Sequence, residues 1–252
     1  MAESSDEDSN GDLLLRTLLE EEGEGPPSLD RSNQQHLQEE ERHHHLESIG
    51  AAIVTRQLPS LGLSFQLWPA AASLLALLDL DPSRLLLPPS SPLRLLELGS
   101  GTGLAGIAAA ALLRADVTLT DLPHVLPNLR SNAESNAPLV AARGGSLRVR
   151  QLRWGSPEDE AALGGAAAFD AVVAADVVYH EHLFDPLLRT VGAFVREGEG
   201  TAFLMAHLRR WKKRDALFFR KARKSFRVAL VHADPPLPGS RTGVAVYRFT
   251  AK

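Results

Sequence analysis

The chain has 252 residues, of which 44% are hydrophobic, and its formal net charge is −4. This length and apolar content suit one α/β domain with a single core. The absence of cysteine excludes disulfides, thiolate metal sites and cysteine nucleophiles. No basic leader is visible and no apolar run approaches about 18 residues, so we expect a soluble protein of the cytoplasm, or of both cytoplasm and nucleus, with no membrane partner.

The two ends of the chain carry opposite charge. Residues 1–48 contain fourteen acidic residues against three arginines, whereas residues 207–252 contain thirteen Lys or Arg against two Asp. We predict an acidic arm over 1–48, largely disordered with room for one short helix, followed by a folded domain over 49–252. Residues 34–47 within this arm would form at most an exposed helix. His43, His44 and His45 point in different directions on a helix, which disfavours a metal site.

The folded domain is predicted to begin with a β-hairpin. Its strands would be 51–57 and 61–67, joined at Leu58-Pro59-Ser60. Trp68-Pro69 then introduces an apolar helix over 70–80, since proline suits the first helical turn. Residues 81–92, which include four prolines, form a linker into the first strand of the main sheet.

A glycine-rich turn lies at the centre of the chain. The apolar strand 93–98 is followed by Gly99, Gly101 and Gly103, and then by an alanine-rich helix over 104–113. Glycines at alternate positions let the backbone approach a ligand, and the N–H groups that open the helix face it. Asp121 ends the next strand, 22 residues after Gly99, which is a spacing suited to an acid that binds a ribose.

The turn therefore predicts a nucleoside-bearing cofactor, although an ordinary strand-to-helix turn remains the alternative. A dinucleotide favours the longer G-x-G-x-x-G spacing, and a triphosphate requires G-x-x-x-x-G-K-[ST], which is absent. The sequence thus favours a cofactor that has a ribose but no polyphosphate.

Strands and helices alternate through the rest of the chain. Helices are predicted at 125–136, 183–196 and 215–224, and strands at 117–120, 147–154, 169–176, 201–207, 228–232 and 244–249. Such alternation indicates a doubly wound parallel sheet, in which ligands bind beyond the carboxyl ends of the strands. Residues 97–103, Asp121, Trp154 and Asp176 all follow strand ends, so we expect them to meet in one crevice.

At these motifs the sequence resembles the seven-β-strand S-adenosylmethionine-dependent methyltransferases, and among them lysine methyltransferase family 16, the methyltransferase-like-21 group. The resemblance covers roughly residues 50–250. It is carried by Trp68-Pro69-Ala70-Ala71, Glu97 to Gly103, Thr120-Asp121-Leu122-Pro123, Leu152-Arg153-Trp154-Gly155 and Ala175-Asp176-Val177-Val178-Tyr179. It implies a Rossmann-like sheet of seven strands, mostly parallel, with a C-terminal antiparallel hairpin.

The resemblance also implies how S-adenosylmethionine is bound. The backbone of Gly99, Ser100 and Gly101 would lie against the methionine part of the cofactor, with Glu97 orienting the turn and Gly103 completing it. Asp121 would accept both ribose hydroxyls. The remaining cofactor contacts would come from Trp154 beside the adenine, Ala175 through its backbone and Trp68 as a cover.

Asp176 and Tyr179 are the predicted catalytic residues. The resemblance implies transfer of a methyl group to a lysine amine, for which the enzyme mainly has to position a neutral amine. A lysine has a pKa near 10.4, and a lone carboxylate would favour its protonated form. Asp176 is therefore expected to orient the amine through a hydrogen bond, with Tyr179 lining the channel. The alternative is that Asp176 caps a helix and Tyr179 packs on it.

The expected partner is a protein that bears the target lysine, and we expect a monomeric enzyme. Two alternatives stay open: a methyltransferase for nucleic acid or a small molecule, and a non-catalytic binding module that keeps the fold. The basic cluster 209–224 would suit phosphates. However, the Asp-Pro-Pro-Tyr type of signature for base methylation is absent, so nucleic acid is not the expected substrate. His180 and His182 lack an evident third ligand, and no metal is expected.

Overall fold

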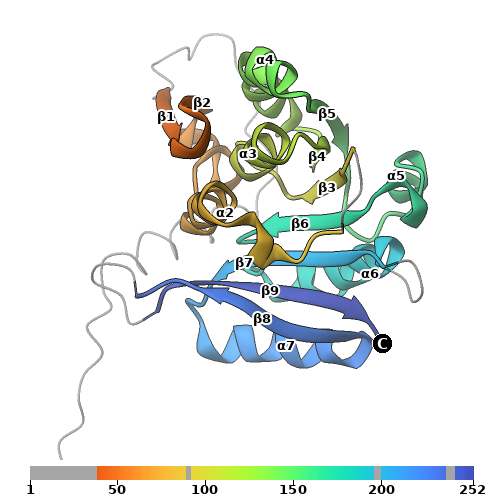
Figure 1. Cartoon of the computed structure of the whole chain (residues 1–252). Coiled ribbons are helices and arrows are strands. Elements are labelled where there is room, and N and C mark those ends of the chain that lie inside the picture. Colours follow the sequence, from red (N-terminus) through yellow and green to blue (C-terminus); the bar gives the residue numbers. More distant parts are fainter. Residues whose placement is uncertain (1–38, 89–91, 196–199, 237–241) are drawn as a thin grey trace, which may run out of the picture.

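A computed structural model describes residues 39–88, 92–195, 200–236 and 242–252 of the chain (Figure 1). Most of the predicted acidic arm, including its short helix, lies outside the described residues. The strands are β1 (Glu40–Leu46), β2 (Ala51–Gln57), β3 (Arg94–Leu98), β4 (Asp116–Asp121), β5 (Ser146–Gln151), β6 (Ala171–Ala175), β7 (Ala202–Leu208), β8 (Phe226–Ala233) and β9 (Val244–Ala251). The α-helices are α2 (Pro69–Leu80), α3 (Leu104–Leu113), α4 (Leu126–Arg143), α5 (Pro157–Ala162), α6 (Phe184–Phe194) and α7 (Lys212–Ser225).

Seven strands form the main sheet in the order β5-β4-β3-β6-β7-β9-β8. The first five of these pair in parallel, whereas β9 runs antiparallel to both β7 and β8. This arrangement confirms the predicted Rossmann-like sheet with a closing antiparallel hairpin. Strand order reverses beside β3, because β4 lies on one side of β3 and β6 on the other. A ligand crevice is expected at such a reversal.

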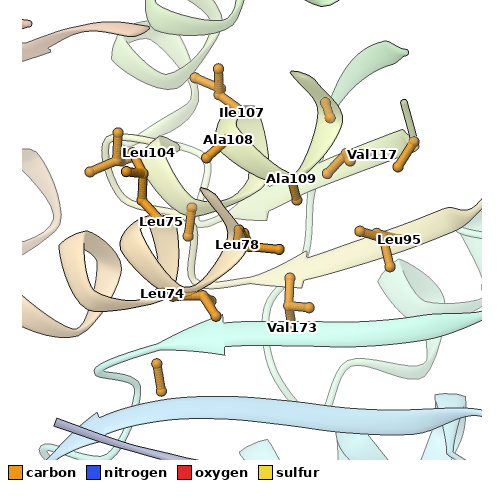
Figure 2. Packing of buried hydrophobic residues seen from close by; sticks show 14 of the residues in the cluster. Leu74, Leu75, Leu78, Leu95, Leu104, Ile107, Ala108, Ala109, Val117 and Val173 are labelled. Carbon is orange, nitrogen blue, oxygen red and sulfur yellow. The ribbon is translucent and has the colours of Figure 1, made fainter. Parts of the chain in front are cut away.

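Helices cover both faces of the sheet (Figure 1). Alternate residues of β3 point to opposite faces, so that Leu95 packs in one core cluster and Leu96 in the other. On the first face, leucines of α2 and alanines of α3 pack against Leu95 and Val173 (Figure 2). The small side chains of α3 let this helix lie close to the sheet. The second face is covered by α6 and α7 and is rich in phenylalanine.

The N-terminal hairpin exists, but one of its predicted strands was wrong. β2 pairs antiparallel with β1, whose residues were expected to be an exposed helix. The helix-forming side chains of β1 are overridden because the β2 backbone offers a complete ladder of partners. Residues 61–67 instead form the short 3-10 turns η2 (Pro59–Leu61) and η3 (Leu63–Phe65), where Leu58 and Phe65 bury against Val125. The other 3-10 turns are η1 (Glu47–Ile49), η4 (Pro82–Leu85), η5 (Ala166–Ala168) and η6 (Glu181–Leu183).

The second edge of β2 is bound by side chains of α4 instead of a third strand. Asn128, Asn132 and Asn136 recur every four residues and are buried on one face of the helix. Their amides donate to or accept from the backbone of Val54 and Arg56. Asn132 also donates to the carbonyl of Thr102, at 2.9 Å. The hairpin is thereby attached to the glycine turn through one helix.

Two predicted element ends were wrong. α4 continues through Pro138 to Arg143, although it was expected to end at 137–138. Proline removes the N–H that would bond the Glu134 carbonyl, but both residues lie on the exposed face, where water can bind that carbonyl. Gly144, with φ of 88°, ends the helix instead. The third strand of the parallel sheet ends at Gln151, which leaves Trp154 in the loop that follows.

One apolar run is longer than expected. The 18 residues Leu63–Leu80 are apolar enough to cross a membrane by length and composition, although no run of this length was anticipated. In the fold the run is divided between η3 and α2, and 44% of it is buried within the protein. Leu74, Leu75 and Leu78 pack in the core against α3 (Figure 2). The core helix of a globular domain satisfies the same criterion.

Candidate active site

A cavity of about 330 Å³ lies at the carboxyl ends of the parallel strands. β3, β4, β6 and the loop after β5 each contribute wall residues, as the strand-end argument predicted. Ten of the eleven residues predicted to form the site line this cavity: Trp68, Glu97, Gly99, Ser100, Gly101, Asp121, Trp154, Ala175, Asp176 and Tyr179. Residues far apart in the sequence therefore share one wall.

Gly103 does not line the cavity. It precedes the first residue of α3 with φ of 84°, and a Cβ at this position would lie 2.7 Å from Leu129 Cδ1. A side chain there would have to displace the side chain of Leu129. Gly103 thus contributes to packing behind the turn, and its predicted contact with a cofactor has no support in the cavity wall.

Ser100 attaches the glycine turn to β4. Its backbone N–H donates to the Thr120 carbonyl at 2.9 Å, and its Oγ accepts from the Thr120 N–H at 3.1 Å. Gly99 and Gly101 flank it with φ of 62° and 55°. The indole of Trp154 lies against Gly99, where an added Cβ would come within 2.9 Å of the ring. This turn brings bare backbone to the cavity surface and places an aromatic ring directly over it.

Glu97 is a buried carboxyl group beneath the turn, with 2% of its surface exposed. Burial raises the pKa of Glu97 from 4.5 to about 8, and the nearby Asp121 carboxylate adds to this effect while the Ser100 hydroxyl opposes it. Its Oε2 atom has no hydrogen bond of good geometry within the described part of the chain. A Cβ on Gly106 would lie 2.5 Å from this oxygen, so α3 can approach Glu97 only at a glycine.

Asp121 ends β4 and points into the cavity. Its Oδ2 accepts from the Gly101 N–H at 2.8 Å, and its Oδ1 accepts from the Leu122 N–H at 2.7 Å. These two bonds fix the carboxylate plane. A carboxylate has two acceptor oxygens, which suits it to bind the paired hydroxyls of a ribose.

Asp176 follows β6 and is held by an arginine that the sequence reasoning did not assign to the site. Arg210 donates from Nη1 to Oδ1 at 3.0 Å and from Nη2 to Oδ2 at 2.9 Å. The Leu208 N–H donates to the same Oδ1, at 3.0 Å. Asp176 adopts φ of 54°, an uncommon left-handed conformation that aspartate tolerates better than most residues. The carboxylate is thus held in a bidentate ion pair, and a hydrogen bond to a substrate amine would have to share it with Arg210.

A buried row of ionisable side chains continues behind Asp176. His207 Nδ1 lies 3.8 Å from Asp176 Oδ1, and His207 Nε2 lies 3.2 Å from Asp215 Oδ1. His207 and Asp215 are both fully buried. The row joins the end of β7 to the first turn of α7, and it keeps the segment that carries Arg210 in place.

Tyr179 lines the cavity from the loop between β6 and α6. Its carbonyl accepts from Arg214 Nη1 at 2.7 Å, and its ring centroid lies 5.0 Å from that of His180. His180 in turn stacks on His182, with ring centroids 5.2 Å apart. The histidine pair therefore braces the tyrosine. Within the described residues, no group of three or more His, Cys, Asp or Glu side chains could hold a metal ion.

Sequence reasoning missed several residues of the wall. Arg210 and Trp211 line the cavity just after β7, and Leu63, Ser64, Gln66 and Leu67 line it from the turns that replace the predicted second hairpin strand. The signal for Arg210 was present, since it lies two residues beyond a parallel strand, where ligand residues gather. The sequence argument instead considered Arg210 only as part of the basic cluster 209–224, which would suit phosphates.

The cavity has the features that S-adenosylmethionine needs. Asp121 offers acceptors for a ribose, Trp154 offers an aromatic surface, and the glycine turn offers backbone beside the buried Glu97 carboxyl group. The fold is shared with a solved structure described as a predicted O-methyltransferase from Agrobacterium tumefaciens, which superimposes with a TM-score of 0.51 at 22% identity, over 73% of this chain and 81% of that one. Fold and site together define an S-adenosylmethionine-dependent methyltransferase.

The sequence comparisons identify the family. A family model described as lysine methyltransferase matches residues 52–225. The zebrafish protein N-lysine methyltransferase METTL21A is 35% identical over 75% of this chain and 78% of its own length. The mouse EEF1A lysine methyltransferase 3 is 36% identical over 56% of each chain. The chain belongs to the lysine methyltransferase family, which confirms the resemblance that the motifs carried.

Proposed function

We propose that this enzyme methylates the ε-amino group of a lysine in an intracellular protein, and that the cavity at the strand ends is where transfer occurs. The observation that carries this proposal is the shared wall: the glycine turn with Asp121 and the Asp-x-x-Tyr segment after β6 line one cavity. The family match and the named lysine methyltransferase relatives support a protein substrate.

The cofactor is assigned to the part of the cavity formed at the ends of β3 and β4, which we call the cofactor half. Asp121 would bind the ribose hydroxyls, and Trp154 would contact the adenine. Glu97 and Ser100 would hold the glycine turn, while Ala175 and Trp68 would close the site. When bound, S-adenosylmethionine supplies a methyl group that leaves its sulfur as the lysine nitrogen forms the new carbon–nitrogen bond.

The substrate lysine is assigned to the part formed at the ends of β6 and β7, the acceptor half, which contains Asp176, Tyr179 and Arg210. A free lysine amine has a pKa of about 10.4, so it arrives protonated and must release a proton to water before it can attack. Tyr179 would line the channel for the lysine chain, and Asp176 would orient the amine. Both residues act by positioning, which is the main requirement of an in-line displacement.

The remaining assignments are also proposals. We propose a monomer of the cytoplasm, or of cytoplasm and nucleus, that acts without nucleic acid or a membrane. The basic helix α7 is compatible with a protein partner, because Phe218 and Phe219 are buried in the core and most of its exposed residues are charged.

The test uses the full chain, radiolabelled S-adenosylmethionine and a cell lysate. We expect label in one or a few protein bands, removed by protease and resistant to nuclease. Tyr179→Ala should reduce labelling strongly while leaving cofactor affinity, measured by calorimetry, within about tenfold. Tyr247→Ala is the matched control, since the other tyrosine of the chain lies on β9 outside the cavity.

Three outcomes separate the candidate functions. Label that nuclease removes and protease does not would overturn the protein substrate in favour of a nucleic acid. Label in small molecules alone would indicate a metabolite methyltransferase. Measurable cofactor binding with no label in any fraction would indicate a binding module that keeps the fold.

A further inference from the structure

Arg210 and Asp176 form an ion pair in the wall of the cavity. Its two terminal nitrogens bond the two oxygens of Asp176, and its guanidinium carbon lies 5.3 Å from the ring centroid of Trp68. The side chain of Arg210 is 18% exposed, whereas that of Asp176 is 3% exposed. The arginine is therefore the outer member of the pair, and it is the member that a ligand in the cavity would meet first.

Both partners of Arg210 are themselves held in place. The Trp68 indole N–H donates to the Leu63 carbonyl at 2.9 Å, which fixes the ring under the guanidinium. Asp176 accepts from the backbone N–H groups of Leu208 and Ala70, at 3.0 and 3.4 Å. A planar guanidinium can make a two-point carboxylate contact and lie over an aromatic ring at once, which a lysine ammonium cannot do. The geometry is specific to arginine.

The charge of this pair bears directly on methyl transfer. A carboxylate alone beside the amine would stabilise the ammonium form, which has no lone pair with which to attack. A carboxylate paired with a guanidinium has a net charge of zero, so this stabilisation is cancelled. The other ionisable groups around the pair are His207 and Asp215 behind it, with Glu97, Asp121, Arg153 and Tyr179 in the cavity wall.

We infer that Arg210 is a positioning residue of the acceptor half, which neutralises Asp176 so that the target lysine is held as a neutral amine. This inference rests on the proposed function. Asp176 then acts through Arg210, the more exposed member of the ion pair. The amine gives its proton to water on entering, and the nitrogen lone pair forms the new bond to carbon while the bond from carbon to sulfur breaks.

The test compares Arg210→Gln, Asp176→Asn, the double variant and Arg210→Lys. The readout is the pH profile of the initial rate of tritium transfer to the lysate protein that the wild type labels most strongly. Arg210→Gln leaves a net negative site, so the acid limb of the profile should move to higher pH by about one unit or more. Asp176→Asn should move it to lower pH, and the double variant should return it close to the wild-type position. Arg210→Lys should keep the limb in place at a lower rate.

A second readout does not depend on turnover. Calorimetry of the same purified protein binding to the enzyme with S-adenosylhomocysteine, in two buffers of different ionisation enthalpy, counts the protons released. Binding of a neutral amine near neutral pH should release about one proton per complex, because the free lysine is protonated. Arg210→Gln should bring this release close to zero. Arg209→Gln removes the same charge from an exposed neighbour outside the cavity wall and should leave both readouts unchanged.

The outcomes separate this inference from the function on which it rests. Wild-type enzyme that transfers no label to protein would overturn the proposed function and, with it, the role of Arg210. Label transfer in which all the variants lower the rate equally at every pH, with proton release unchanged, would show that Arg210 only stabilises the fold. Movement of the acid limb in the same direction for Arg210→Gln and Asp176→Asn would also contradict the inference.

Discussion

The two halves of the cavity hold their acidic side chains in different ways. In the cofactor half, Asp121 and Glu97 are held by backbone N–H groups and a hydroxyl, and burial keeps Glu97 largely protonated at neutral pH. In the acceptor half, Asp176 is paired with the guanidinium of Arg210. The Asp121 carboxylate is assigned to neutral ribose hydroxyls, whereas a substrate amine beside Asp176 has to lose its positive charge. The difference follows from what each half has to bind.

The strongest test of the cofactor half is the pH dependence of stability. Glu97 titrates near 4.5 when unfolded and near 8 when folded. Below a pH of about 4.5, Glu97 is protonated in both the folded and the unfolded state, so it does not make the unfolding free energy depend on pH. As pH rises from there to about 8, the unfolded state binds fewer protons, so the unfolding free energy falls, by up to about 5 kcal/mol.

The glutamine of Glu97→Gln cannot titrate, so the unfolding free energy of this variant should not show this decline with pH. Urea unfolding at pH values of about 5, 7 and 9 measures the unfolding free energy. The difference in this free energy between Glu97→Gln and the wild type should grow with pH, in favour of the variant. Glu134→Gln, on the exposed face of α4, should follow the wild type. Parallel curves for Glu97→Gln and the wild type would mean that Glu97 is not held protonated by the fold.

A second test concerns the space below the turn. A Cβ on Gly106 would lie 2.3 Å from Leu119 Cδ2 and 2.5 Å from Glu97 Oε2, so Gly106→Ala should lower the unfolding free energy by about 2–3 kcal/mol. Gly192 lies in α6, and its nearest neighbour would be Phe226 Cζ at 3.8 Å. Gly192→Ala should therefore raise stability by about 0.5–1 kcal/mol, through better helix propensity. Urea unfolding of both variants measures the contrast, and equal effects would contradict it.

The third test separates binding in the two halves. Asp121→Ala should weaken S-adenosylmethionine binding by about thirtyfold, or about 2 kcal/mol, because charge-assisted hydrogen bonds to the ribose are lost. Calorimetric titration measures this affinity. Asp116→Ala changes the other end of the same strand, outside the cavity, and should bind the cofactor as the wild type does. Unchanged affinity in Asp121→Ala would remove the ribose assignment.

The sequence predicted the cofactor half more completely than the acceptor half. The glycine turn and Asp121 are local features of two consecutive strands, and each residue follows its strand end directly. Gly103 does not line the cavity, and the sequence does not reveal that Leu129 of α4 lies beside it. In the acceptor half, Asp176 and Tyr179 were found from one short segment, whereas the partner of Asp176 lies 34 residues further on.

The fold shows the same limit. The doubly wound, mostly parallel sheet could be expected from alternating patterns, because each βαβ unit is local and has a fixed hand. β1 was missed because its side chains favour a helix in isolation and only the register with β2 makes it a strand. The turns at η2 and η3 were mistaken for a strand because Leu63, Phe65 and Leu67 alternate with polar residues, as the residues of a strand do. Contacts that depend on a distant partner leave no local pattern to detect.

The smallest expected effect distinguishes the ring of Tyr179 from its hydroxyl. If the tyrosine lines the acceptor half by its ring, Tyr179→Phe should lower kcat/KM by no more than about threefold, well under 1 kcal/mol, and leave cofactor affinity unchanged. A loss above about tenfold would instead assign the hydroxyl a hydrogen bond to the substrate amine. Tyr247→Phe is the control, since this half-buried ring packs on Phe219, with centroids 4.6 Å apart, away from the cavity. A fall in cofactor affinity for Tyr179→Phe would mean that this residue serves both halves, and the division of the cavity by charge would then have to be drawn elsewhere.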